Sequence, residues 1–360
     1  MEHIPLAKTY LDDEIRDLTL EVLDSGQWVK GPQSKAFGSE WAEWCGALAG
    51  APTSNGSTAL IAALRLLRIG PGDEVIVPSL TFISSSTCID QVGATPIFVD
   101  VEPEYYTMCP QSVEEAITPS TKAIIAVHLF GQVVDPKIMN LGVPVIEDAA
   151  QAHGAEYNGD KVGSLGNLAT FSFFPSKNLT VGGDGGALLA NSKAHTGILT
   201  ASTDHGRHQK GEYNFLSSNF RLSEVQCAIG RAQLKHLEKW CQRRREIAEK
   251  YSKSFHPNSI PKVRERSKHG WNQYVLKITK PKLFREYMDN CGIDTAIHYS
   301  TPTHLQPIYS QHHQSKLGTL PFTEEICKNL VAIPVFPQLT DDEVEYIISS
   351  IQAWQSDILA

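Results

Sequence analysis

From residue 74 onward the chain alternates short apolar segments with helical or polar ones. The apolar segments lie at residues 75–77, 96–99, 123–128 and 143–146. Strands that are apolar throughout and separated by helices are typical of a parallel sheet covered on both faces. In such sheets ligands bind beyond the carboxyl ends of the strands. The pattern therefore predicts an α/β fold, with candidate site residues directly after the strands.

The length of the chain predicts two domains of unequal size. Its 360 residues exceed one ordinary domain, which favours a large domain with a smaller one. Beyond Pro257 the pattern changes to shorter strands and helices. We predict a large domain over residues 1–250 and a small C-terminal domain over residues 251–360.

Composition and charge exclude several classes of function. A net charge of −8 argues against nucleic acid as the main partner. No apolar run approaches the roughly 20 residues that a membrane span needs, and the N-terminus lacks a signal-peptide pattern. The seven cysteines are scattered without a Cys-x-x-Cys pair, so neither a disulfide framework nor a metal site is indicated. We expect a cytoplasmic protein that binds no metal.

One lysine stands between two apolar segments. An aromatic run at 170–174 precedes Lys177, a glycine cluster follows at 182–186, and a second apolar run covers 187–190. This order predicts a buried strand, a tight turn and a returning strand. Partial burial lowers the pKa of a lysine and makes it nucleophilic. For this segment alone, a surface lysine at a strand end is the alternative.

A second candidate site is formed by two residues at the predicted start of a helix. Gly56 and Ser57 precede a strongly helical run at 59–67. The first backbone N–H groups of a helix are unpaired and lie at the positive end of its dipole, which suits a phosphate. A simple helix cap is the alternative.

Pyridoxal 5′-phosphate (PLP) accounts for these features together. This cofactor needs a lysine, a carboxylate beside its pyridine nitrogen and a phosphate cradle. Lys177 and Asp148 supply the first two, and Ser172 joins the Gly56–Ser57 helix start as the cradle. Phe82 can hold the face of the cofactor ring. The alternative for Asp148 is a helix N-cap.

In this combination the sequence resembles the DegT/StrS family of PLP-dependent sugar aminotransferases, which have the aspartate-aminotransferase-like fold (fold type I). The motifs that carry the resemblance are Gly26-Gln27-Trp28, Asn55 to Leu60, Pro78 to Phe82, Glu147 to Gly154, Thr170 to Leu179, Asn219-Phe220-Arg221 and Ala332 to Pro337. The resemblance implies a large domain with a mostly parallel seven-stranded sheet and a smaller C-terminal α+β domain.

The resemblance also implies roles for individual residues. Lys177 and Asp148 are the implied catalytic residues. The implied cofactor-binding residues are Gly56, Ser57, Phe82, Asp148, Gln151, Ser172, Lys177 and Asn219, the last acting on the cofactor of a neighbouring subunit. The implied substrate-binding residues are Arg221, His298 and Tyr299.

Alternatives remain open for several of these residues. Arg221 can bind a carboxylate of the amino donor or form a structural ion pair. His298 and Tyr299 can approach the sugar or only pack, and Asn219 can cap a helix of its own chain. Asn272 stands where relatives often have histidine, and an amide cannot perform acid–base chemistry.

Thr180 and Val181 occupy positions where relatives often have smaller residues. This difference suggests an altered pocket beside the lysine.

The function implied by the resemblance is transfer of an amino group from L-glutamate to a keto group of a nucleotide-linked sugar. The segments 177–179 and 183–186 favour carbon 3 of the sugar over carbon 4. We expect a homodimer with shared active sites. The alternatives are amination of a cyclitol ketone or a free keto-sugar acid, and, in a different class, a non-catalytic PLP-binding regulator.

Overall fold

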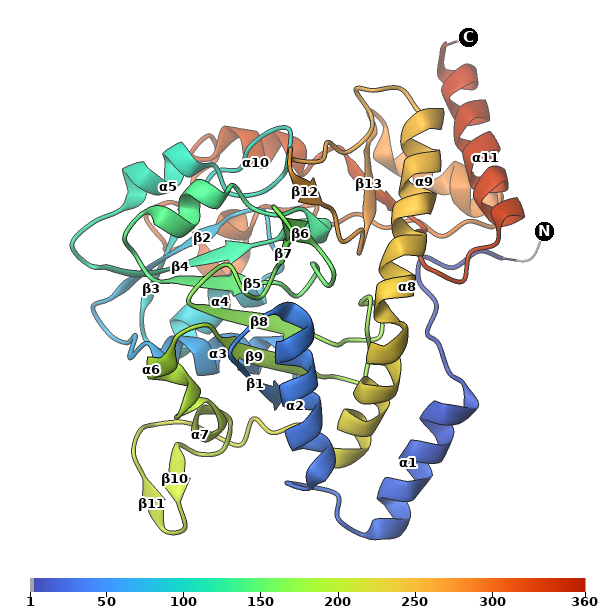
Figure 1. The fold of residues 1–360 in the computed structure, drawn as a ribbon. Coiled ribbons are helices and arrows are strands. Elements are labelled where there is room, and N and C mark those ends of the chain that lie inside the picture. Colours follow the sequence, from blue (N-terminus) through green and yellow to red (C-terminus); the bar gives the residue numbers. More distant parts are fainter. Residues whose placement is uncertain (1–2, 360) are drawn as a thin grey trace.

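The computed structural model describes residues 3–359 and is built around one seven-stranded sheet (Figure 1). Helices cover both faces of this sheet. In spatial order the strands are β1 (Ala49–Thr53), β9 (Gly186–Ala190), β8 (Leu168–Ser172), β5 (Val145–Asp148), β4 (Thr121–Val127), β2 (Glu74–Pro78) and β3 (Thr95–Val99).

Strand β9 is the one antiparallel member of this sheet. It pairs antiparallel with both β1 and β8, whereas every pair from β8 to β3 is parallel. Alternate residues of β2 enter different apolar clusters, Val75 and Val77 one and Ile76 another, so both faces are buried. The predicted mostly parallel seven-stranded sheet is confirmed.

The helices include one that is much longer than the rest. They are α1 (Asp13–Ser25), α2 (Pro32–Cys45), α3 (Gly56–Leu66), α4 (Ser84–Gln91), α5 (Pro110–Ala116), α6 (Lys193–Thr196), α7 (Leu199–Thr203), α8 (Glu224–Ser254), α9 (Pro281–Asn290), α10 (Pro321–Ile326) and α11 (Asp341–Leu359). Short 3-10 helices are η1 (Leu129–Gly131), η2 (Pro136–Asn140), η3 (Thr303–Leu305) and η4 (Pro307–Tyr309).

The remaining strands form three small sheets. Strands β6 (Glu156–Tyr157), β7 (Asp160–Lys161) and β12 (Ser267–Lys268) form one, β10 (Arg207–Gln209) and β11 (Glu212–Tyr213) the second, and β13 (Tyr274–Lys277) and β14 (Leu330–Ile333) the third.

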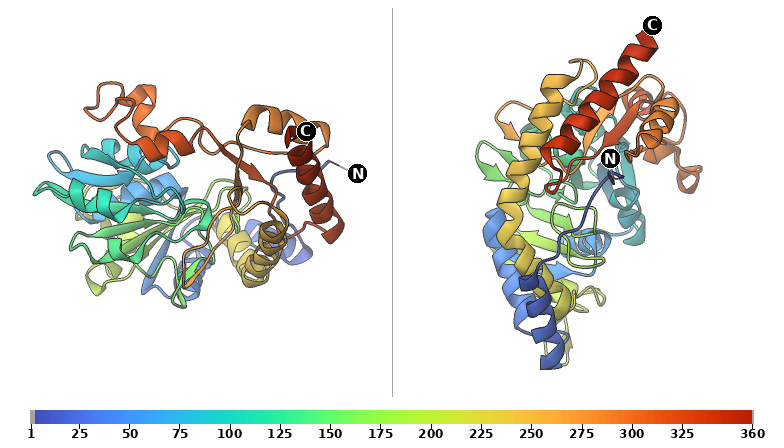
Figure 2. Two further views of the ribbon diagram at one scale, coloured as in Figure 1. Left: turned by 90° about the horizontal axis from the view of Figure 1, so that it is seen from above. Right: turned by 90° about the vertical axis from the view of Figure 1, so that its right-hand side faces the viewer.

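Helix α8 contributes to two separate apolar cores. Its residues Cys227 and Leu237 pack in the cluster around α2, β8 and β9. Ile247 and Tyr251, near its C-terminal end, pack in a second cluster with β13, β14, α9 and α11. Figure 2 shows α11 running beside this end of α8. The N-terminal residue Ile4 belongs to the second cluster too. The domain division between residues 250 and 251 stays a prediction.

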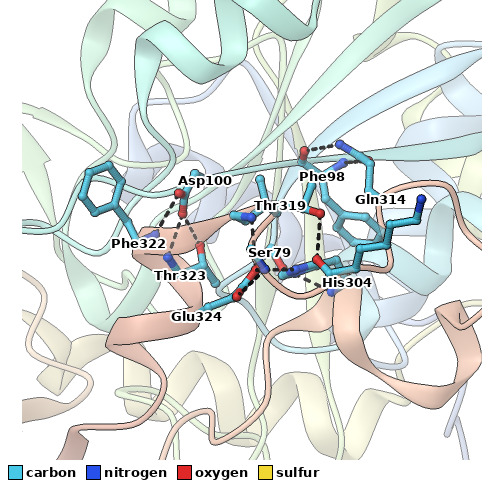
Figure 3. A network of polar contacts seen from close by, with 12 residues as sticks. Ser79, Phe98, Asp100, His304, Gln314, Thr319, Phe322, Thr323 and Glu324 are labelled. Carbon is cyan, nitrogen blue, oxygen red and sulfur yellow. Dashed lines mark hydrogen bonds and ion pairs between the residues drawn. The ribbon is translucent and has the colours of Figure 1, made fainter.

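A segment near the C-terminus folds back onto the carboxyl ends of β2 and β3 (Figure 3). Ser79 Oγ lies 2.6 Å from His304 Nδ1. Asp100 Oδ1 accepts hydrogen bonds of 2.7 Å from both the backbone N–H and the hydroxyl of Thr323. The amide of Gln314 pairs with both backbone groups of Phe98 on the edge strand β3. These contacts anchor residues 303–323 to the large sheet.

Glu147 is a fully buried carboxylate beside the candidate site. Its oxygens accept bonds from His128 Nε2 at 3.0 Å and from the backbone N–H groups of Gly163, Leu165 and Gly166 at 3.0, 2.8 and 2.7 Å. Four donors compensate the desolvation of this charge. Glu147 thereby fixes the loop at 163–166 to the end of β5.

Residues 3–359 contain neither a candidate membrane span nor a candidate metal site. No helix within that range is long and apolar enough to cross a membrane. The same residues contain no group of three or more His, Cys, Asp and Glu side chains suited to a metal ion.

Candidate active site

Asp148 ends strand β5 and lies at the base of the site. Its side chain is buried, and Oδ2 accepts a 2.7 Å hydrogen bond from Ser85 Oγ of helix α4. Oδ1 accepts a 3.2 Å bond from the backbone N–H of Ala150. Burial raises the pKa of Asp148, while these two donors and the nearby Lys177 oppose the shift. The carboxylate is therefore held in a fixed orientation at the carboxyl edge of the sheet.

Lys177 lies in the loop after β8 rather than on the strand itself. The strand ends at Ser172, and the loop turns with a 2.8 Å bond from Lys177 N to Phe174 O. Burial lowers the pKa of Lys177 to about 8, and the Asp148 carboxylate partly offsets this shift. Near neutral pH a usable fraction of this amine is unprotonated, as a nucleophile or base requires.

Two asparagines hold the lysine loop in place. The buried Asn178 donates to the backbone carbonyls of Gly270 at 2.8 Å and His153 at 3.3 Å. Asn272 donates to Ser176 O and to Asn178 Oδ1, both at 3.2 Å. The residue that replaces the family's frequent histidine therefore contacts the lysine loop directly. Sequence reasoning missed this role because it depends on a contact between residues more than 90 positions apart.

The N-terminus of helix α3 and the end of β8 meet as expected. Asn55 caps the helix by accepting from Thr58 N at 2.9 Å, and the Thr58 hydroxyl accepts from Asn55 N. A Cβ added to Gly56 would lie 3.1 Å from Ser172 Cβ, so glycine permits the close approach. Asn55 supplies the cap, which leaves the Gly56 end of the helix beside Ser172. The Ser57 hydroxyl lies 2.7 Å from Ser84 Oγ.

Gln151 connects the sheet to the C-terminal part of the site. Its Oε1 accepts from Phe130 N at 2.8 Å, and its Nε2 donates to the Tyr299 hydroxyl at 3.1 Å. Tyr299 in turn lies 6.2 Å, ring to ring, from the half-exposed Phe82. Burial and the nearby Lys177 lower the pKa of His298 to about 4, so its imidazole is neutral at physiological pH. His298 is thus placed near Lys177, and Tyr299 is placed beside Gln151.

The segment that carries Asn219 and Arg221 pairs with the chain just before helix α3: Arg221 forms a β-bridge with Thr53, and Ser54 N donates to Phe220 O at 2.7 Å. Asn219 is exposed, and Ser223 rather than Asn219 caps helix α8, with Ser223 Oγ accepting from Gln226 N at 3.3 Å. The alternative that Asn219 caps its own helix is therefore wrong. Arg221 pairs with Asp204, which also accepts from Lys30 Nζ at 2.6 Å. The structural ion pair proposed as the alternative for Arg221 is present.

The arrangement of the site residues fits PLP. Asp148 at the end of β5 and Lys177 in the loop after β8 lie at the same edge of the sheet, near enough for each to influence the pKa of the other, so one could face the ring nitrogen of the cofactor and the other its reactive carbon. The glycine-permitted approach of α3 to Ser172 leaves helix N–H groups for a phosphate. A half-exposed aromatic ring lies above the same edge of the sheet.

The fold and the site together define a fold type I aminotransferase. The profile of the DegT/DnrJ/EryC1/StrS aminotransferase family matches residues 9–352, and the chain belongs to this family.

Two curated relatives cover nearly the whole chain. The chain is 38% identical over 349 residues to the UDP-N-acetyl-3-dehydro-alpha-D-glucosamine 3-aminotransferase of Acidithiobacillus ferrooxidans, covering 95% of this chain and 94% of the relative. It is 36% identical over 351 residues to the pleiotropic regulatory protein of Geobacillus stearothermophilus, covering 95% and 94%.

Solved structures show the same similarity. The chain resembles S. venezuelae DesV in complex with a ketimine intermediate, with a TM-score of 0.94 and 34% identity over 98% of this chain and 99% of that chain. It also resembles Spr1654 from Streptococcus pneumoniae in its PLP form, with a TM-score of 0.92 and 25% identity over 99% and 100%.

Proposed function

We propose that this protein is a PLP-dependent aminotransferase that transfers an amino group from L-glutamate to a keto group of a nucleotide-linked sugar. The observation that carries the proposal is the lysine of lowered pKa beside the buried Asp148, at the carboxyl edge of a sheet shared with sugar aminotransferases.

Individual residues of the site would have separate roles in this reaction. When bound, the cofactor supplies an electron sink for the carbon that loses its proton. Asp148 would face the pyridine nitrogen, and the α3 N-terminus with Ser57 and Ser172 would hold the phosphate. Lys177, with a pKa of about 8, can accept a proton from the substrate carbon and return it. The Gln151 amide has a second N–H proton beyond the bond to Tyr299, which we assign to the 3-hydroxyl of the cofactor.

The sugar would lie against the segment that carries His298 and Tyr299. A neutral imidazole can accept a hydrogen bond from a sugar hydroxyl. The name of the Acidithiobacillus ferrooxidans relative places its amination at carbon 3, and this supports carbon 3 over carbon 4 here.

The reaction is tested with purified protein, PLP, L-glutamate and a panel of 3-keto and 4-keto nucleotide sugars. We expect 2-oxoglutarate release and amination of the 3-keto set. Lys177→Ala should abolish both, whereas Lys253→Ala, which alters an exposed lysine of α8, should not. Turnover of only 4-keto sugars would overturn the carbon 3 assignment, and full activity of Lys177→Ala would overturn the mechanism.

A non-catalytic regulator is the second candidate, because one close relative is named a pleiotropic regulatory protein. A regulator of this kind would bind PLP without releasing 2-oxoglutarate from glutamate. Measuring that release in the absence of any sugar separates the two functions.

The shared active site is also part of the proposal. The exposed Asn219 is free of the capping role in its own chain, and its amide can donate to a phosphate of the partner's cofactor without adding charge. Inactive Lys177→Ala and Asn219→Ala subunits should regain activity when mixed, because the mixed dimer keeps one intact site. If heterodimers form and activity does not return, Asn219 acts within its own subunit.

A further inference from the structure

A pair of buried hydroxyl groups lies behind the catalytic carboxylate. Ser85 Oγ lies 2.7 Å from Asp148 Oδ2, and Thr81 Oγ1 lies 2.8 Å from Ser85 Oγ. Ser85 and Thr81 are 1% and 3% exposed. The two hydroxyls therefore form a connected chain that ends at the side chain expected to face the cofactor.

The direction of each hydrogen bond in this chain follows from the number of protons. An ionised carboxylate can only accept, so Ser85 must give its single hydroxyl proton to Asp148. The Ser85 oxygen then has only acceptor capacity left, and Thr81 must be the donor in the second bond. Both hydrogen bonds are consequently polarised toward Asp148. In such a chain each hydrogen bond strengthens the next.

The neighbouring hydroxyls of helix α4 behave differently. Ser86 Oγ and Thr87 Oγ1 both donate to Ile83 O, within their own turn, as serine and threonine in helices usually do. Ser85 instead reaches a residue 63 positions away on β5. Its hydroxyl is thus not needed for the local geometry of the helix.

Thr81 is itself bound by a residue from the C-terminal part of the chain. Its backbone carbonyl accepts a 3.4 Å bond from the Thr303 hydroxyl, and Thr303 N donates to Ser79 O at 2.9 Å. Thr303 follows the substrate candidate Tyr299 by four residues. The hydroxyl chain therefore begins where the segment that carries His298 and Tyr299 is anchored.

We propose that Ser85 is a positioning residue for the aminotransferase reaction: it orients Asp148 and keeps it ionised toward the cofactor's ring nitrogen, and Thr81 orients Ser85. The proposal rests on PLP being the cofactor. Burial by itself favours the neutral acid, which cannot stabilise a protonated pyridine nitrogen. The Ser85 hydrogen bond lowers the pKa of Asp148 and so opposes this effect.

The test compares Ser85→Ala, Thr81→Val and their double variant with Ser86→Ala as the matched control. Each is a small change in the same helix or the turn before it, and circular dichroism verifies folding. Two quantities are measured: the dissociation constant for PLP, and the pH at which the visible absorbance of the bound cofactor changes.

We expect Ser85→Ala to weaken PLP binding by about 10- to 100-fold, the range for losing a hydrogen bond to a charged group, and to shift the absorbance titration. Thr81→Val should give a smaller change in the same direction. Adding it to Ser85→Ala should have little further effect, because Thr81 acts through Ser85. Ser86→Ala should match the wild type.

Ser85→Thr keeps a hydroxyl and should restore the wild-type titration. If Ser85→Ala does not fold, Thr81→Val is the informative variant, because the Thr81 hydroxyl acts through Ser85. Failure of the wild type to bind PLP overturns the proposed function. Normal binding by the wild type with an unchanged dissociation constant and titration in Ser85→Ala overturns this inference alone, as do additive effects of the two changes.

Discussion

Replacing Glu147 by glutamine tests whether the buried carboxylate holds the site together. The change conserves volume and leaves Asp148 and Lys177 untouched. A carboxylate can accept on both oxygens, whereas an amide can accept on only one and presents N–H groups on the other side. The four donors are arranged in pairs, His128 and Gly163 on one oxygen and Leu165 and Gly166 on the other.

Either orientation of the glutamine amide therefore leaves two buried donors facing N–H groups. His128 cannot relieve the conflict by moving its proton, because its Nδ1 already accepts from Val134 N at 3.2 Å. An unsatisfied buried donor costs about 1–3 kcal/mol, so two predict a loss of about 2–6 kcal/mol in the free energy of unfolding. That is a large fraction of the stability of an ordinary domain.

Urea titration followed by circular dichroism measures this free energy for Glu147→Gln and the wild type without cofactor. Glu249→Gln is the control, because Glu249 is exposed and pairs with Lys253 on the same helix; it should unfold like the wild type. A Glu147→Gln protein as stable as the wild type would refute the reasoning, since the four donors would then not depend on the negative charge.

Two further predictions concern Lys177 and the start of α3. Covalent incorporation of PLP at Lys177, trapped by borohydride, should rise with pH around a midpoint near the pKa of about 8 and level off well above it, because the unprotonated amine reacts; a midpoint near the ordinary lysine pKa would contradict the lowered value. Asn55→Ala removes the acceptor for Thr58 N and should reduce the free energy of unfolding by about 1 kcal/mol, measured by urea titration, with Asn140→Ala as a surface control that is expected to be neutral.

The sequence pattern was sufficient for the parallel part of the sheet and for α8. Apolar strands between helices have a strong periodic signal, and Ser223 is the N-cap that the pattern favours. Strand β1 was not predicted, because Gly50 and Pro52 disfavour a strand by composition. It forms because its edge position and pairing with β9 tolerate both residues.

The sequence predicts only those site residues whose type and position by themselves indicate a chemical role. Lys177, Asp148 and the Gly56 helix start stand out by type and position. The hydroxyl of Ser85 and the amide of Asn272 do not, because serine and asparagine are common at helix starts and in loops. Their contacts join distant parts of the chain, 63 residues apart for Ser85 and Asp148, and no local pattern encodes them.

The position of Ile4 has a consequence for how the protein is made. Ile4 is fully buried, and its N–H and C=O bond to Gly292 and Asp294. The cluster around it extends to Ile351 of α11. A ribosome synthesises the chain from its N-terminus, so the residues that cover Ile4 emerge last. Ile4 therefore lacks its full cover until helix α11 has emerged from the ribosome.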